Sequence, residues 1–171
     1  REQIYLTGFP LPKELVGGAN ATIVRHDLGV RLANLDPNGI LRDRYRATFR
    51  RHFGKHFHER PTRPVTITFA VGGAGAQRAI GVALLKSLRK RIRRHEFRLN
   101  LIAGTRREAA HDFEQQVRAL RLGDELGRGV RICYEHKRWD YFRAFSGILR
   151  ETDILWTKPS ELSFYTGLGL P

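Results

Sequence analysis

Hydrophobic and polar positions alternate along the chain in two periods, and the pattern becomes regular from residue 65 onward. Short apolar runs rich in β-branched residues predict strands, whereas apolar residues at every third or fourth position predict helices. Glycine and proline separate the runs, as at the ends of secondary structure elements. The expected strands are residues 65–71, 97–103, 130–134 and 153–156, and the expected helices are residues 76–95, 107–120, 139–149 and 160–168.

Strands that alternate with helices in this way form βαβ units, whose right-handed crossovers build a parallel sheet with helices on both faces. The sequence therefore predicts an α/β fold with a Rossmann-like, doubly wound parallel sheet. We expect the sheet to be C-terminally incomplete, because the chain stops directly after its fourth helix. Ligands of such sheets bind at the carboxyl ends of the strands. Here those ends are residues 72–75, 104–106, 134–136 and 157–161.

The first 64 residues are less regular. Residues 4–7 predict a short strand, and residues 13–39 predict loop with short turns, with a weak strand pattern near residues 28–35. Residues 40–57 predict a helix. Its apolar positions recur every four residues, at Leu41, Tyr45, Phe49 and Phe53. We therefore expect a linker and helical extension over residues 1–64 and a truncated Rossmann-like domain over residues 65–171.

The net charge limits the classes of ligand and partner that the chain attracts. The chain holds 31 Lys and Arg against 17 Asp and Glu, a formal net charge of +14. Such a charge attracts phosphorylated ligands, nucleic acid or anionic lipid headgroups. Two basic clusters, residues 42–55 and 86–94, fall on helical patterns, where the ordinary interpretation is a solvated face. A single cysteine excludes an internal disulfide and indicates a reducing, cytoplasmic location. The sequence has no apolar run long enough to span a bilayer.

The first regular strand runs into a glycine turn. Gly72, Gly73 and Gly75 follow it with only Ala74 between them, and a helical pattern begins at once. Glycines between a strand and a helix allow backbone N–H groups to point at a phosphate. The spacing departs from the full dinucleotide fingerprint, so a merely tight connection is an equal alternative.

Other candidate chemistry has an ordinary structural alternative. His52, His56 and His58 are spaced for metal binding, but the arginines and lysine among them disfavour a cation, and we expect no metal site. Cys133 stands inside an apolar strand and is expected in the core. The remaining candidates are three polar residues for acid–base work or a helix cap, and three aromatic residues for base stacking or the core. They are Glu135, His136 and Asp140, and Trp139, Phe142 and Phe145.

Four stretches together resemble the C-terminal, donor-binding domain of the GT-B glycosyltransferases. Residues 6–10 (LTGFP) are similar to the family's interdomain T-G-N-P segment, and residues 71–76 (VGGAGA) to its phosphate loop. Residues 130–134 (VRICY) stand where the family has the strand before its base-contacting loop. Residues 153–159 (DILWTKP), with the final Gly-Leu-Pro, resemble the A-D-x-x-x-T-K-P-G-G…G-x-P block. Within this family, the chain is most similar to the N-acetylglucosaminyltransferases that make lipid II and to the processive diacylglycerol glucosyltransferases.

The resemblance implies a nucleoside diphosphate-sugar donor, usually uridine-linked, as substrate, with no separate cofactor. It makes residues 65–171 a nucleotide-sugar-binding domain of a hexosyltransferase-like enzyme whose acceptor domain and catalytic residues lie elsewhere, so that this part alone is expected to be inactive. The implied substrate-binding residues lie near the diphosphate, the base, and the sugar with its ribose. In that order they are Gly72, Gly73, Ala74 and Gly75; Glu135; and Lys158, Pro159, Ser160, Glu161 and Ser163.

The chain also departs from the family's pattern. Ser160 and Glu161 replace a second glycine pair, Ala74 replaces a hydroxyl residue, and Phe164 or Thr166 stands near the expected ribose-binding glutamate. A non-catalytic, basic Rossmann-like module that binds nucleic acid or an anionic membrane therefore stays open as the alternative. A nucleotide-sugar epimerase of the same fold would need carboxylates that the sequence does not place.

Overall fold

A four-stranded parallel sheet forms the centre of the molecule. The computed structural model describes residues 11–70, 77–158 and 162–171. The strands are β1 (Val65–Ala70), β2 (Phe97–Gly104), β3 (Val130–Tyr134) and β4 (Ile154–Thr157). They pair in parallel in the order β3-β2-β1-β4. The predicted α/β, Rossmann-like fold is thus confirmed.

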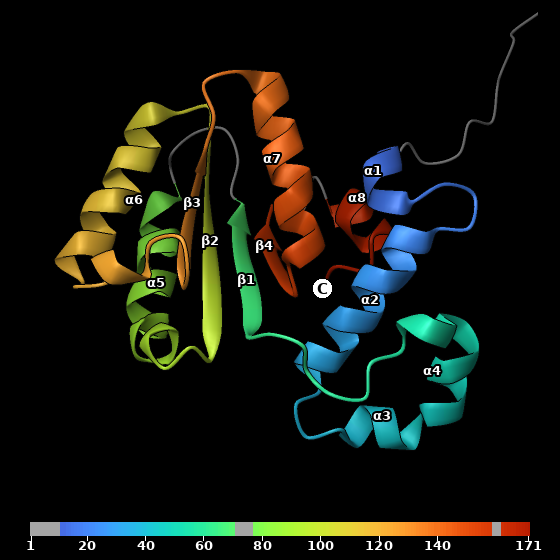
Figure 1. Cartoon of the computed structure of the whole chain (residues 1–171). Coiled ribbons are helices and arrows are strands. Elements are labelled where there is room, and N and C mark those ends of the chain that lie inside the picture. The colour runs from blue at the N-terminus through green and yellow to red at the C-terminus, as the bar shows by residue number, and fades with distance from the viewer. Residues whose placement is uncertain (1–10, 71–76, 159–161) are drawn as a thin grey trace, which may run out of the picture.

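Helices cover both faces of this sheet (Figure 1). The crossover helices α5 (Arg78–Arg93) and α6 (Arg107–Ala119) lie together on one face. On the other face α7 (Arg138–Glu151) carries the chain from β3 past β2 and β1 to β4. The short helix α8 (Leu162–Gly167) follows β4, and the 3-10 helix η2 (Gly123–Glu125) precedes β3. The crossovers from β1 to β2 and from β2 to β3 run in one direction across the sheet, and the crossover from β3 to β4 runs back past β1, so the strand order reverses between β1 and β4.

The N-terminal part is more helical than the sequence pattern predicts. It contains α1 (Lys13–Val16), α2 (Thr22–Leu35), α3 (Ile40–Arg44), α4 (Arg46–Phe53) and the 3-10 helix η1 (Gly54–His56). The predicted loop over residues 13–39 is therefore wrong, and so is the weak strand near residues 28–35. The single helix expected over residues 40–57 is interrupted at Tyr45, whose φ of −118° is not helical.

The composition of the buried face of α2 explains why hydrophobic periodicity does not predict this helix. The helix buries polar and small residues in place of an apolar stripe, so it has no visible period of hydrophobic positions. The residues buried there are Asp27, Gly29, Arg31, Ala33 and Asn34.

The main core lies between the sheet and helices α5 and α6. Fully buried aliphatic residues of α5 and β2 meet Phe113 and Val117 of α6. In α5, Leu85 and Ile92 are fully buried, whereas Ile80 is 37% exposed.

The aromatic residues of α7 divide between core and surface. Phe145 is buried, whereas Trp139 is 81% exposed and Phe142 is 50% exposed. The alternative that all three aromatic residues belong to the core is therefore wrong. Six positions along a helix rotate a side chain by about two thirds of a turn, so Trp139 faces away from the side on which Phe145 packs.

A buried charge network joins the N-terminal helices to the sheet. Arg31 donates hydrogen bonds to the carbonyl oxygens of Thr152 at 2.8 Å, Leu168 at 3.2 Å and Gly169 at 3.1 Å. Burial lowers the pKa of this guanidinium, and the carboxylate of Asp153 opposes that effect. Leu15 of α1 shares an apolar cluster with residues of α7 and α8. The division of the chain at residue 64 stays a prediction, and the two ranges share this core.

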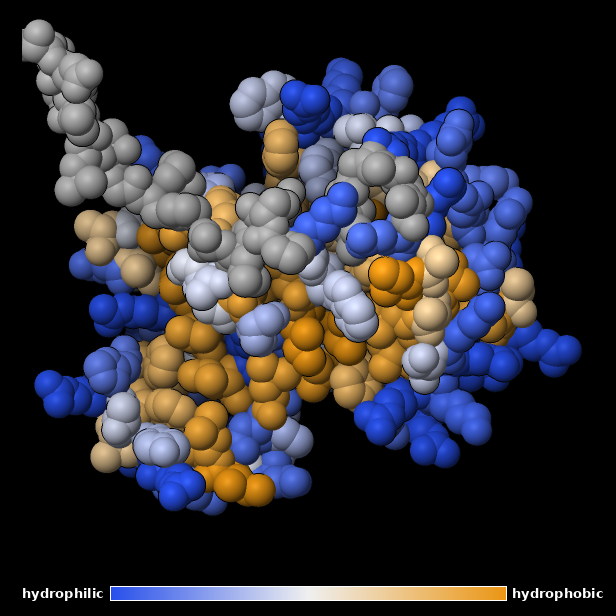
Figure 2. Space-filling view, turned by 180° about the vertical axis from the view of Figure 1, so that it is seen from behind, coloured by the Kyte–Doolittle hydropathy of each residue, from blue (hydrophilic) through white to orange (hydrophobic). Residues whose placement is uncertain are grey.

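None of the described helices is long and apolar enough to cross a bilayer. Seen from behind (Figure 2), the molecule shows apolar side chains in the middle of the face and hydrophilic ones along the side that holds α5 and α6.

Candidate functional site

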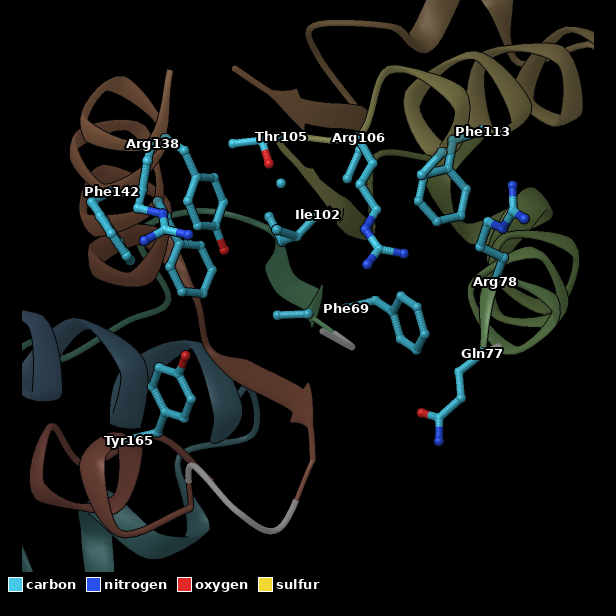
Figure 3. A pocket seen from close by; sticks show the side chains of 16 residues that line it. Phe69, Gln77, Arg78, Ile102, Thr105, Arg106, Phe113, Arg138, Phe142 and Tyr165 are labelled. Atoms are coloured by element: carbon cyan, nitrogen blue, oxygen red, sulfur yellow. The ribbon is translucent and has the colours of Figure 1, made fainter. Parts of the chain in front are cut away.

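A cavity of about 320 Å³ opens at the carboxyl ends of β1 and β2 (Figure 3). In open α/β sheets this edge is where ligands bind. The cavity is bounded by the ends of these strands, the beginnings of α5, α6 and α7, and α8. The described residues that line it are Phe69, Ala70, Gln77, Arg78, Ile102, Ala103, Gly104, Thr105, Arg106, Ala109, Phe113, Arg138, Tyr141, Phe142, Phe145 and Tyr165.

The strand ends fix the floor of the cavity. Thr157 at the end of β4 donates its hydroxyl to the carbonyl oxygen of Ala70 at 3.0 Å, which ties β4 to the end of β1. Gly104 ends β2 with a φ of +67°, a conformation that favours glycine. The chain turns there and presents Thr105 and Arg106 before α6 begins.

Three arginines give the cavity a positive charge. In Figure 3 Arg106 lies between Arg138 of α7 on one side and Arg78 of α5 on the other. Arg78 forms an ion pair with Asp112, on the neighbouring helix α6. Arg106 and Arg138 are exposed and have no hydrogen bond or ion pair from their side chains to the described residues. No acidic residue is among the described lining residues, so the site favours an anion.

Aromatic rings form the rest of the wall. The ring of Tyr141 stacks on Phe145, with centroids 5.6 Å apart and planes 11° apart. Tyr165 of α8 meets Phe145 edge-on at 6.3 Å. Phe69 and Phe113 close the opposite side, beside α5 and α6. A planar, aromatic ligand group can stack in such surroundings.

Most of the predicted site residues lie outside the described residues. These are Gly72, Gly73, Ala74, Gly75, Pro159, Ser160 and Glu161, together with the side chain of Ser163. Lys158 follows β4 directly. The backbone N–H of Glu135 donates to the carbonyl oxygen of Gly104 at 3.0 Å, which places Glu135 beside the end of β2. Neither Lys158 nor Glu135 lines the described part of the cavity.

Sequence reasoning missed the arginines that the structure brings together. The sequence predicts residues 104–106 as a strand end without a role for Arg106, and Arg138 stands just before the helix predicted over residues 139–149. A cation directly after a parallel strand, with a second one at the start of a later crossover helix, is the signal that could have identified them.

The other candidate groups are explained structurally. His56 and His58 pack against His26, with ring centroids 5.7 Å and 6.0 Å away. Partial burial, with the charges of His26 and His56, lowers the pKa of His58. Over the described ranges, no group of three or more His, Cys, Asp or Glu could hold a metal ion. Cys133 is buried, which confirms its core position and raises the pKa of its thiol.

Comparison with known proteins gives a family without an activity. Residues 53–167 match the family described as Domain of unknown function (DUF6938). No curated protein and no solved structure matches the chain. The matched range holds all four strands and every helix of the candidate site. Since this match covers more than half of the 171 residues, the chain belongs to the DUF6938 family of domains of unknown function.

Proposed function

We propose that the cavity binds a nucleoside diphosphate-sugar, with uridine as the base, and that the domain is the donor-binding part of a glycosyltransferase. The observation that carries this proposal is the pair of arginines, Arg106 and Arg138, without partners among the described residues, at a cavity with aromatic walls. The sequence resemblance to GT-B enzymes supports the same substrate class. The proposal of a glycosyl transfer rests on the resemblance, because we assign a catalytic role to none of the described residues.

The two kinds of lining residue suit the two parts of a nucleotide. A diphosphate needs cationic donors, and guanidinium groups match phosphate oxygens with paired N–H bonds. A base needs a flat apolar surface, which the rings of Tyr141, Phe142 and Phe145 offer. The volume of about 320 Å³ is at the lower end of the range of small-molecule sites. It suits one nucleotide rather than a polymer.

The test is a calorimetric titration of the protein with UDP-glucose, UDP-N-acetylglucosamine, UDP and ADP. We expect saturable binding of the uridine compounds, weaker binding of ADP, and weakening by about tenfold to a hundredfold in Arg106→Gln and in Arg138→Gln. The matched control is Arg118→Gln, which removes the same charge from an exposed position on α6 that does not line the cavity. The proposal fails if no uridine compound binds saturably, or if all three variants weaken binding equally.

The rival function is a non-catalytic module for nucleic acid or an anionic membrane, favoured by the net charge of +14. Binding to a phosphate backbone weakens steeply as salt rises, whereas a nucleotide held partly by stacking loses less. Titrations with an RNA oligonucleotide and with anionic vesicles at two salt concentrations therefore separate the two functions. For either one we propose a cytoplasmic location, since a single free thiol suits a reducing compartment.

A further inference from the structure

A second polar cavity lies at the opposite edge of the sheet. It has a volume of about 330 Å³ and opens at the amino ends of β1, β2 and β3, beside the last residue of α7. We call it the amino-edge cleft. Its described lining residues are Pro64, Thr66, His95, Phe97, Arg98, Asn100, Gly127, Arg128, Gly129, Arg131 and Glu151. It shares none of them with the first cavity.

The charges of the amino-edge cleft are unbalanced. Three arginines line it, Arg98, Arg128 and Arg131, and all three are exposed. Within the described part of the chain their side chains have no hydrogen bond or ion pair. Glu151 is the one acidic residue among the described lining. His95 Nδ1 lies 3.9 Å from the buried carboxylate of Glu125, which is not itself among the lining residues.

The sheet register brings two of these cations together. Arg98 is opposite Thr66 of β1, and Arg131 is opposite Asn100 of β2. Arg98 and Asn100 are two residues apart on β2, so both arginines lie on the same face of the sheet as diagonal neighbours. This is the face that carries α7, which ends at Glu151 beside the cleft.

Like charges in this arrangement repel each other and disfavour the folded state. The C-terminus of α7 and the carboxylate of Glu151 lie beside the cleft, and they offset part of this repulsion. One carboxylate stands against three arginines among the described lining residues, so the cleft keeps an excess of positive charge. An anion in the cleft would offset the repulsion.

The floor of the cleft is polar and held in place. Asn100 is 6% exposed and donates from its Nδ2 to the hydroxyl of Thr68 at 2.9 Å. That hydroxyl lies 2.7 Å from the hydroxyl of Thr152, which donates to the carbonyl oxygen of Ile148 at 2.7 Å. The amide of Asn100 is thus fixed by a buried chain of hydrogen bonds, and its side chain lines the cleft.

We propose that the amino-edge cleft is a second binding site, specific for the phosphate groups of a small phosphorylated molecule. Arg98, Arg128 and Arg131 bind the phosphate oxygens, and Asn100 and Thr66 form the polar floor. The site differs from the first cavity in its surroundings, because its described lining holds only the rings of His95 and Phe97, and Arg91 lies over the ring of Phe97 at 5.3 Å. It therefore recognises phosphate without a stacked base.

The experiment titrates the protein with inorganic pyrophosphate, which carries the phosphate groups and no base. We expect two sites in the wild-type protein. The double variant Arg98→Gln/Arg131→Gln keeps the first-cavity site and weakens the other by about tenfold or more. The double variant Arg106→Gln/Arg138→Gln does the reverse. Arg107→Gln/Arg118→Gln, with the same change in charge at exposed positions on α6, keeps both sites. Circular dichroism of each variant verifies that it is folded.

Each result is assigned to one site. If Arg98→Gln/Arg131→Gln binds pyrophosphate as the wild type does, the cleft is not a phosphate site and the proposal is overturned, whatever happens at Arg106 and Arg138. If Arg106→Gln/Arg138→Gln binds pyrophosphate as the wild type does and Arg98→Gln/Arg131→Gln binds it more weakly, the proposed function fails and the proposal for the cleft is supported. Competition arms use an RNA oligonucleotide and anionic vesicles. Binding of either one that depends on Arg98 and Arg131, without pyrophosphate binding, also overturns the assignment to a small molecule.

Discussion

Asp153 forms a buried ion pair with Arg63, so a change that removes only its charge should destabilise the protein strongly. Its carboxylate is 0% exposed and accepts hydrogen bonds from Arg63 Nη1 at 2.5 Å and Nη2 at 3.0 Å, and from the backbone N–H of Thr66 at 2.8 Å. Asn34 of α2 donates to it from Nδ2 at 3.2 Å. The substitution Asp153→Asn keeps the shape of the side chain. It removes the charge and turns one accepting oxygen into an NH₂ group that faces other donors.

The expected loss of stability follows from the burial of this pair. Removing one partner of a buried ion pair typically costs about 3–5 kcal/mol, because the other charge stays buried without compensation. The side chain of Arg63 is only 17% exposed, so water screens it poorly. For a chain of this length, each kcal/mol lowers the midpoint of thermal unfolding by roughly 2–4 °C. We therefore expect Tm to fall by about 6–20 °C.

The assay is urea unfolding followed by circular dichroism, with Asp124→Asn as the matched control. Asp124 is exposed, and its substitution should change the stability by about 0.5 kcal/mol or less. The double variant Asp153→Asn/Arg63→Met should recover part of the loss, because the uncompensated cation is then absent. A loss below about 1 kcal/mol in Asp153→Asn would refute the reasoning, since an essential buried ion pair cannot be neutralised at so small a cost.

Two further predictions test the packing of α2. A Cβ atom on Gly29 would lie 2.0 Å from the carbonyl oxygen of His56, so Gly29→Ala should lower the free energy of unfolding by about 1–3 kcal/mol. In the control Gly147→Ala, a Cβ meets nothing within 4 Å, so the free energy of unfolding should rise by up to about 1 kcal/mol in the same urea titration. Equal effects of the two substitutions would contradict the close packing of Gly29 against His56. The pKa of His58 lies below the ordinary 6.5 in the folded protein, so the unfolded chain takes up the proton first as pH falls. Stability should therefore decrease as pH falls through 6.5 and stay lower below the folded pKa, with a smaller decrease in His58→Gln; identical pH profiles of Tm for the two proteins would exclude this role.

The α/β half of the fold could be predicted because its elements bury apolar faces. The strands and helices from residue 65 onward lie within a few residues of the positions that hydrophobic periodicity indicates. Periodicity identifies an element only when its buried face is apolar. The helix α2 buries Asp27, Arg31 and Asn34 against hydrogen-bonding partners far along the chain, so its pattern resembles that of a loop.

The position of the first cavity agrees with the edge that the topology predicts for ligands, but its lining arginines could not be predicted. The expectation that ligands bind at the carboxyl ends of the strands follows from topology alone, and the first cavity lies at that edge. Arg106 and Arg138 are 32 positions apart in the sequence. Only the pairing of β2 with β3 and the course of α7 place both at one cavity. No local motif contains that information.

Basic clusters in the sequence also do not identify the cations that are free to bind an anion. In the first basic cluster, residues 42–55, Arg46 and Arg50 both form ion pairs with Glu59. Arg42, in the same cluster, is buried and paired with Asp36. The arginines that line the two cavities without partners among the described residues lie outside both basic clusters. They stand after a strand, within a strand, in the loop before β3 or at the start of a helix. A bound anion can gain most from a cation whose charge no carboxylate has already compensated. Among the described residues, the fold collects arginines that form no ion pair at the two edges of the sheet, and we expect the net charge of +14 to attract an anion there.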